Sequence, residues 1–164
     1  MTDVSDHPAE RASAGEEQPA RRTYGQGDAT FQACGGEAGL RRLVEAFYAE
    51  MAARPEARTI LTLHPEDLTT SIDKLARFLC GWTGGPKRYA EKYGSIKIPR
   101  AHRHLPIHEA ERDAWLVCMK HALAGQPYPD DLKRYLLEQL FVPAERIRRV
   151  VGEREGASEE RAAL

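Results

Sequence analysis

Residues 84–119 read GGPKRYAEKYGSIKIPRAHRHLPIHEAERDAWLVCM and hold the most informative spacing in this chain of 164 residues. The segment begins with Gly84-Gly85-Pro86, a combination that is typical of a helix end. Residues 84–104 then show almost no apolar period, and long irregular connections in a compact domain are usually functional or disordered. Because His102 and His104 lie at the far end of this interval, they are candidates for a functional role.

Four apolar stripes at helical spacing surround this segment. The first predicted helix begins after Gly35-Gly36 and ends near Pro55, and the second ends at Gly84-Gly85-Pro86. The third is entered through the acids Glu109 and Glu111, and the fourth opens with Pro129-Asp130-Asp131. No segment has the pattern of a strand, so the predicted class is all-α. The stripes consist of Leu40, Leu43, Val44, Phe47, Tyr48 and Met51; Leu68, Ile72, Leu75, Leu79 and Trp82; Leu116, Met119 and Leu123; and Leu132, Tyr135, Leu136 and Leu140.

The chain divides into a folded core and two polar ends. Residues 1–26 are almost entirely small, charged, Pro or Gly, and they cannot bury enough surface to offset chain entropy, which predicts a disordered tail. Residues 27–151 form the predicted domain. Residues 152–164 are charged and Ala-rich, and we interpret them as an extension that can prolong the last helix as a frayed end.

The charge balance limits the partners that we expect. With 24 basic and 25 acidic residues, the net charge is −1, so no long-range field attracts nucleic acid or an anionic membrane. No stretch approaches the roughly 18 apolar residues of a membrane span, and no apolar signal segment is evident, which predicts a cytoplasmic location. The three cysteines form no Cys-x-x-Cys pair and are expected to be reduced and buried.

The two histidines at the end of the irregular interval admit more than one interpretation. A lone histidine is most often an ordinary surface or core residue. His102 and His104 would share a face if the segment were extended, so a zinc site is conceivable, but no second pair of Cys or His lies at ligand spacing. A cofactor-free helical interaction domain would also account for the four stripes.

The pattern of the segment resembles the group II truncated haemoglobin family. The similarity rests on Gly84-Gly85-Pro86, Tyr89, a histidine, the run Glu111-Arg112-Asp113-Ala114-Trp115-Leu116, and Cys118-Met119. In that family the iron-binding histidine stands eighteen residues after the first glycine and thirteen before the tryptophan, and both counts give His102. His104 has spacings of twenty and eleven, so the resemblance implies that His102 is the proximal ligand.

The upstream half extends the resemblance to about residues 28–150. It matches at Gly35-Gly36, at Phe47-Tyr48-Ala49 and at Leu63-His64-Pro65-Glu66-Asp67. The family fold, and therefore the expected fold, is a globin-like two-over-two helical sandwich that encloses haem b (iron protoporphyrin IX). A cofactor-free domain would leave the two histidine spacings as coincidence.

The resemblance also implies roles for residues around the haem. The family positions that line the distal side correspond to Tyr48, His64, Ser71, Leu75 and Trp115. Because a porphyrin is a broad apolar plate, the expected wall residues include Phe47, Phe78 and Leu79, which would also be ordinary core residues. The candidate partners of the haem propionates are Tyr89, Lys97, Arg100 and Arg103. The alternative is that these side chains are ordinary solvated surface residues.

Dioxygen or another diatomic ligand is the expected small-molecule partner. Tyr48 and Trp115 supply an O–H and an N–H, His64 adds a group that can change charge, and the small Ser71 leaves an access path. Several donors in a low-dielectric pocket predict slow ligand release. A peroxidase-like or nitric-oxide-consuming enzyme is the alternative function, and a reductase partner and a monomeric or homodimeric state are left open.

Overall fold

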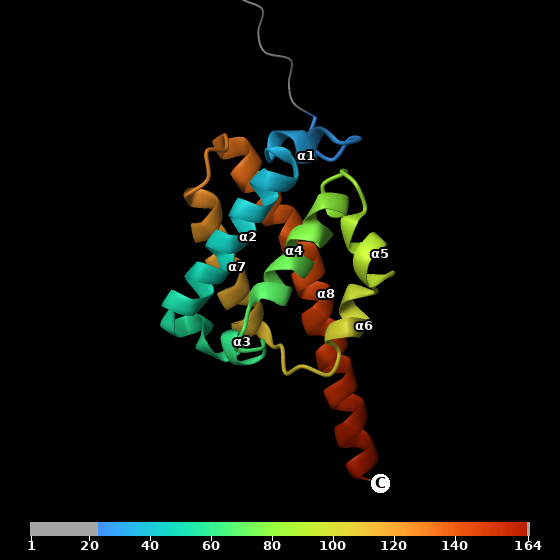
Figure 1. Cartoon of the computed structure of the whole chain (residues 1–164). Coiled ribbons are helices and arrows are strands. Elements are labelled where there is room, and N and C mark those ends of the chain that lie inside the picture. Colours follow the sequence, from blue (N-terminus) through green and yellow to red (C-terminus); the bar gives the residue numbers. More distant parts are fainter. Residues whose placement is uncertain (1–22, 164) are drawn as a thin grey trace, which may run out of the picture.

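The computed structural model describes residues 23–163, which fold around four long helices (Figure 1). These are α2 (Gly36–Ala53), α4 (Thr69–Trp82), α7 (Glu109–Ala124) and α8 (Asp130–Ala162). Helices α2, α7 and α8 begin where the sequence predicts, and α4 ends just before Gly84-Gly85-Pro86, as predicted. No strand occurs among the described residues. The all-α prediction is therefore confirmed.

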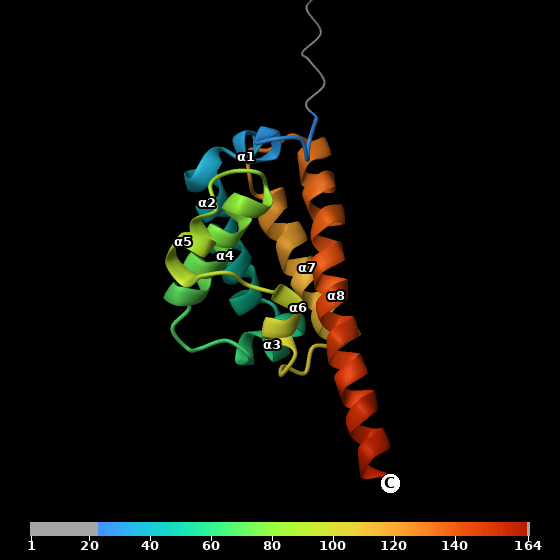
Figure 2. The same ribbon diagram turned by 90° about the vertical axis from the view of Figure 1, so that its right-hand side faces the viewer.

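The long helices pack as two pairs. Helix α2 contacts both α4 and α7, and α7 contacts α8, so the α2–α4 pair lies across the α7–α8 pair (Figures 1 and 2). The apolar stripes meet between the layers, as a helix with a continuous apolar face requires. The expected two-over-two sandwich results. Its fully enclosed side chains include Leu40, Leu43, Val44, Phe47, Met51, Leu79, Met119, Leu123, Leu132 and Leu136.

Short helices occupy the segments between the long ones. They are α1 (Ala29–Ala33), the 3₁₀ turn η1 (Pro55–Ala57), α3 (Arg58–Thr62), α5 (Arg88–Tyr93) and α6 (Ile98–His102). The interval that had no apolar period thus contains two short helices, α5 and α6. Pro99 lies in the first turn of α6, where its missing N–H costs no hydrogen bond.

At both ends the structure describes residues beyond the predicted domain of residues 27–151. Residues 1–22 of the predicted tail lie outside the described residues, but the ring of Tyr24 packs 5.2 Å from that of Tyr135. Helix α8 continues without interruption past residue 151 to Ala162 and carries Pro143 in its interior. No described helix combines the length and apolar character needed to cross a membrane.

The Gly-Gly-Pro turn is built against the segment around α1. Gly84 has a φ of 93°, and a Cβ there would come 1.9 Å from the carbonyl oxygen of Gly27. A Cβ on Gly85 would lie 2.4 Å from the ring of Phe31, whose N–H donates to the carbonyl of Thr83 at 3.0 Å. The two glycines therefore let the end of α4 approach α1 closely.

Gly84→Ala is expected to lower the free energy of unfolding by at least about 2 kcal/mol, because the side chain meets both an unfavourable φ and the Gly27 backbone. Circular dichroism during heating should then show a melting temperature lower by roughly 5 °C or more. Gly152→Ala is the control, since Gly152 lies within α8 with open space around it. That change should leave stability equal or higher. Equal melting temperatures for the two variants would contradict the role of the turn.

Candidate functional site

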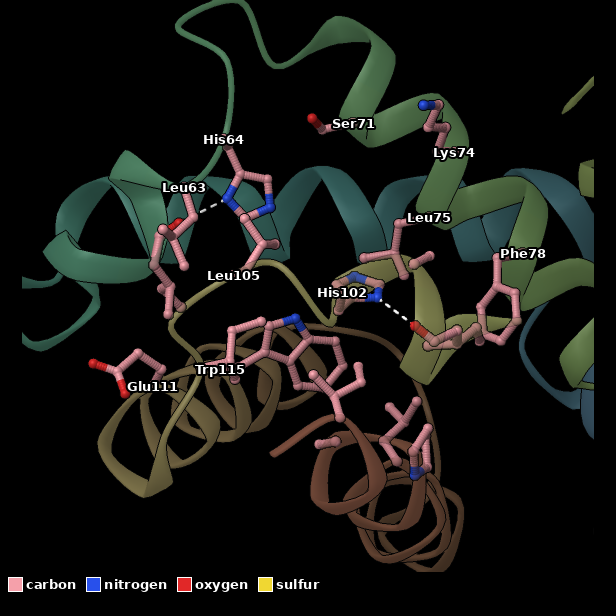
Figure 3. Close-up of a pocket in the computed structure, with 18 of the residues that line it drawn as sticks. Leu63, His64, Ser71, Lys74, Leu75, Phe78, His102, Leu105, Glu111 and Trp115 are labelled. Carbon is pink, nitrogen blue, oxygen red and sulfur yellow. Dashed lines mark hydrogen bonds between the residues drawn. The ribbon is translucent and has the colours of Figure 1, made fainter. Parts of the chain in front are cut away.

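A cavity of about 420 Å³ lies between α4, α6, α7 and α8 (Figure 3). This volume is in the range of small-molecule and cofactor sites. Its wall is mainly aliphatic and aromatic, with a few polar groups. The lining residues are Tyr48, Ile60, Leu63, His64, Ser71, Lys74, Leu75, Phe78, Leu79, Tyr89, Ile96, Ile98, Ala101, His102, Leu105, Ile107, Glu111, Arg112, Trp115, Leu140, Pro143, Ala144 and Ile147.

His102 lines this cavity from the last turn of α6. Its Nδ1 lies 2.7 Å from the carbonyl oxygen of Ile98, drawn as a dashed line in Figure 3. A carbonyl oxygen can only accept, so Nδ1 carries the hydrogen and donates it. In the neutral imidazole the other nitrogen, Nε2, then keeps its lone pair. Such a hydrogen bond at one ring nitrogen is the usual arrangement for a histidine that ligates a metal through the other.

An aromatic cluster forms another part of the wall. The rings of Tyr48 and His64 meet edge to face with centroids 5.4 Å apart, and Phe47 lies between Tyr48 and Trp115 at 5.1 and 4.9 Å. Nδ1 of His64 donates to the carbonyl of Ile60 at 2.8 Å, which orients the imidazole. The cluster therefore holds Tyr48, His64 and Trp115 in fixed positions around one space.

The hydroxyl of Tyr48 is available as a donor. Tyr48 is 6% exposed, and its hydroxyl forms no hydrogen bond with any residue in the part of the chain that the structure describes. Burial raises the pKa of Tyr48 to about 12, because the charged phenolate is disfavoured away from water. Tyr48 thus keeps its O–H at neutral pH and can donate it to a molecule in the cavity.

Helix α4 contributes one face to the cavity, with Ser71, Lys74, Leu75 and Phe78 at steps of three and four. Figure 3 shows these side chains along one side of the site, with Trp115 of α7 on the other and His102 between them. Lys74 was not among the residues proposed from the sequence. The same helical spacing that selected Leu75 and Phe78 would have included it.

Comparison with known proteins places the chain in a family. The family model described as "Bacterial-like globin" matches residues 29–147. The chain is also 33% identical over 117 residues to the Group 2 truncated hemoglobin YjbI of Bacillus subtilis, covering 71% of this chain and 86% of that protein. The chain belongs to the group II truncated haemoglobins.

Solved structures of group II relatives have the same fold. The group II 2-on-2 hemoglobin of Agrobacterium tumefaciens superposes with a TM-score of 0.69 at 34% identity, covering 73% of this chain and 92% of that one. The truncated oxygen-avid haemoglobin of Bacillus subtilis gives 0.66 at 31% identity, covering 72% and 97%. The truncated-globin fold expected from the sequence is therefore confirmed, and family membership implies a haem cofactor.

Some residues proposed from the sequence do not lie on the cavity wall of this truncated haemoglobin. Phe47 is fully buried behind Tyr48 and Trp115, where it supports the wall residues from the core. Lys97, Arg100 and Arg103 are exposed and do not line the cavity, because α6 turns its apolar side chains inward. Leu79 and Tyr89 do line it.

Asp73 connects three helices of this truncated haemoglobin next to the cavity. Its carboxylate accepts from Arg41 of α2 at 2.8 Å, from Arg77 at 3.0 Å, and from Lys92 and Tyr93 of α5 at 2.8 and 2.7 Å. These hydrogen bonds, with Lys92 and Tyr93 the largest contributors, hold the pKa of Asp73 well below its usual range. The ring of Tyr93 packs 5.2 Å from that of Tyr89, so Asp73 indirectly fixes a wall residue.

Asp73→Asn is expected to lower the melting temperature near neutral pH, because three cations lose their common partner. The lowered pKa means that this stabilisation is present above 3.8, the ordinary Asp value, and is lost as the pH falls below it. The difference in melting temperature between the wild type and Asp73→Asn should therefore become smaller in acid. Glu138→Gln serves as control, because Glu138 is exposed and forms no ion pair with the described residues. If the melting temperatures of the wild type and Asp73→Asn differed by the same amount down to about pH 2, this account would be contradicted.

A second ionic network ties α7 to α8 beside the cavity. Arg112, which is on the wall, donates to Glu145 at 2.6 Å, and Glu145 also accepts from Arg148. The two guanidinium groups, Arg148 first, lower the pKa of Glu145 to about 2. Glu145 therefore stays charged over the whole neutral range and keeps Arg112 in place. No local sequence pattern predicts the pair of Arg112 and Glu145, since 33 positions separate its members.

Proposed function

We propose that this truncated haemoglobin binds haem b in the cavity, with Nε2 of His102 as the proximal iron ligand and dioxygen or another diatomic molecule as its ligand. The observation that carries the proposal is the hydrogen bond from Nδ1 of His102 to the carbonyl of Ile98, at the wall of an apolar cavity. It leaves Nε2 with a lone pair, as iron ligation requires. When bound, haem supplies an iron atom with one coordination position open to a small ligand.

The lining of the cavity fits a porphyrin. Leu75, Phe78 and Leu79 of α4 supply apolar surface on one side, and Ile98 of α6 and Ile147 of α8 supply it elsewhere. Two polar side chains on the wall, those of Lys74 and Tyr89, are suited to the carboxylates of haem. Their presence on the wall supports these two residues as propionate partners over Lys97, Arg100 and Arg103.

The distal donors are Tyr48, Trp115 and His64. Tyr48 keeps its proton at neutral pH, and Trp115 can only donate. Both side chains could donate a hydrogen bond to a dioxygen molecule held in the cavity, which would carry partial negative charge when bound to haem. Ser71 and Leu75 complete the distal side as a small and an apolar group, which leaves room for ligand entry.

Absorption spectra of the purified chain test the proposal. Protein produced with ample haem should show a Soret band, and ferric, ferrous and oxygenated forms should be distinguishable. A colourless product that does not take up added haem would refute the proposal. The spectrum reports the cofactor, its coordination and its ligand in one measurement.

Catalysis is the second candidate function, because a protonated Tyr48 beside His64 is also a proton donor set suited to O–O chemistry. A peroxidase-like activity would require turnover rates well above those of free haem. The substitution Tyr48→Phe should then lower these rates. A nitric-oxide-consuming activity would require the oxygenated protein to remove nitric oxide and to need an electron donor afterwards. Rates equal to those of free haem would exclude the peroxidase-like activity.

A further inference from the structure

The surface around α6 carries a concentration of unpaired positive charge. We define the α6 basic patch as Lys97, Arg100, Arg103 and His104, all of which are exposed. None of these side chains forms an ion pair or hydrogen bond with the residues that the structure describes. They are also absent from the cavity wall, so the patch is not part of the cofactor site itself.

The neighbouring segments do not neutralise this patch. No Asp or Glu occurs in residues 92–108. In helix α8, which packs beside α6, residues 144–155 carry four arginines and three glutamates. Of these glutamates, Glu145 already holds Arg112 and Arg148. Because the net charge of the whole chain is −1, the positive charge here is a local asymmetry and not a general property.

The patch flanks the proposed iron ligand. Arg100 and Arg103 lie two residues before and one residue after His102, and α6 is at the surface of the molecule beside α8 (Figure 2). A partner seated on α6 would therefore be separated from the cavity by little more than one short helix. An electron needs such a short path between donor and acceptor.

We propose that the α6 basic patch is the docking site of a one-electron donor protein with an acidic surface. This inference rests on the proposed function, because the electron goes to haem iron. The donor is oxidised by one electron and the ferric iron is reduced to the ferrous state, with no atom transferred. Charge complementarity of this kind steers encounter and raises association rates by roughly 10- to 1000-fold.

The composition of the patch favours a protein partner over a membrane or a nucleic acid. The apolar side chains Ile96 and Ile98 line the cavity, which leaves no apolar anchor for a lipid surface. Three permanent cations are few compared with the roughly 6–10 phosphate contacts that make DNA binding strong. Electron-transfer complexes, in contrast, are small, polar and transient.

Binding of the haem-loaded chain to an acidic plant-type [2Fe–2S] ferredoxin tests the proposal. Isothermal titration should show salt-sensitive binding, stronger at about 10 mM than at about 200 mM ionic strength, because salt screens exposed charges. The triple variant Lys97→Gln, Arg100→Gln, Arg103→Gln should weaken this binding at least about 10-fold. The rate at which reduced ferredoxin converts the ferric protein should fall in parallel.

The matched control is the triple variant Arg42→Gln, Lys120→Gln, Arg134→Gln. These three residues are exposed, form no ion pair with the described residues and lie on other helices, and their loss changes net charge equally. Equal weakening by both triple variants, or no binding of ferredoxin, would overturn the proposal. So would patch-dependent binding to phosphatidylserine vesicles or duplex DNA that exceeds binding to ferredoxin. Haem content and oxygen affinity, measured on the same samples, would report separately on the proposed function.

Discussion

His102→Ala is expected to remove the protein-derived iron ligand and, with it, most of the affinity for haem. Loss of an outer-shell partner of a metal ligand typically costs about 10- to 100-fold in affinity, so loss of the ligand itself should cost more. The ferrous spectrum of any haem retained should lack the signature of a bound histidine. Added imidazole should restore it, because the vacated space next to α6 accommodates the missing ring.

His104→Ala is the matched control for this variant. His104 lies two positions away in the same segment but is exposed and does not line the cavity. It should therefore keep the wild-type spectrum. Far-UV circular dichroism of both proteins would identify a general loss of helix. If His104→Ala lost the ligand and His102→Ala kept it, the assignment from the two spacings would be refuted.

The long helices were predictable because each buries a continuous stripe. Leu40, Leu43, Phe47 and Met51 repeat on one face of α2, and this period exists in the sequence before any tertiary contact forms. Helix ends were predictable for the same kind of local reason, as at Gly35-Gly36, where both glycines have positive φ. Local chemistry thus determines most of the framework.

The short helices could not be predicted, because five or six residues make fewer than two helical turns and cannot show a repeated apolar pattern. Isolated helices of this length are unstable in water, so α5 and α6 exist through tertiary contacts. Helix α5 is held by Asp73 through Lys92 and Tyr93, and α6 is held by α8. Neither contact is visible in the local sequence.

The candidate site also combines residues that the sequence predicts with residues that only the tertiary structure brings together. The family spacing predicts His102 as the iron ligand. The structure brings this residue to one cavity with Tyr48, His64 and Trp115, which come from distant parts of the chain. Proximity in sequence to His102 predicts Lys97, Arg100 and Arg103 as propionate partners, but none of them lies on the cavity wall. In α6, Ile98 and His102 face the cavity. The neighbouring cations therefore lie on the exposed side of this short helix. Lys74, 28 positions earlier, lies on the wall instead.

Removing the distal donors is expected to accelerate dioxygen release strongly. A hydrogen bond to a charged acceptor is worth about 1.5–3 kcal/mol, so Tyr48→Phe and Trp115→Phe should each raise the dissociation rate roughly 10- to 100-fold. Stopped-flow displacement of dioxygen by carbon monoxide measures these rates. Because Tyr48 and Trp115 both contact Phe47 and share one ligand, the double variant should deviate from the sum of the single effects.

Tyr128→Phe separates ligand stabilisation from a general effect of losing a buried hydroxyl. The hydroxyl of Tyr128 is buried and donates to the carbonyl of Cys34 at 2.8 Å, remote from the cavity wall. Its loss should lower stability by about 1 kcal/mol and leave dioxygen release unchanged. Tyr48→Phe should accelerate dioxygen release and leave stability nearly unchanged. The reason is that the Tyr48 hydroxyl has no partner among residues 23–163 and so contributes little to folding. Unchanged release in Tyr48→Phe would mean that Trp115 or His64 alone holds the ligand.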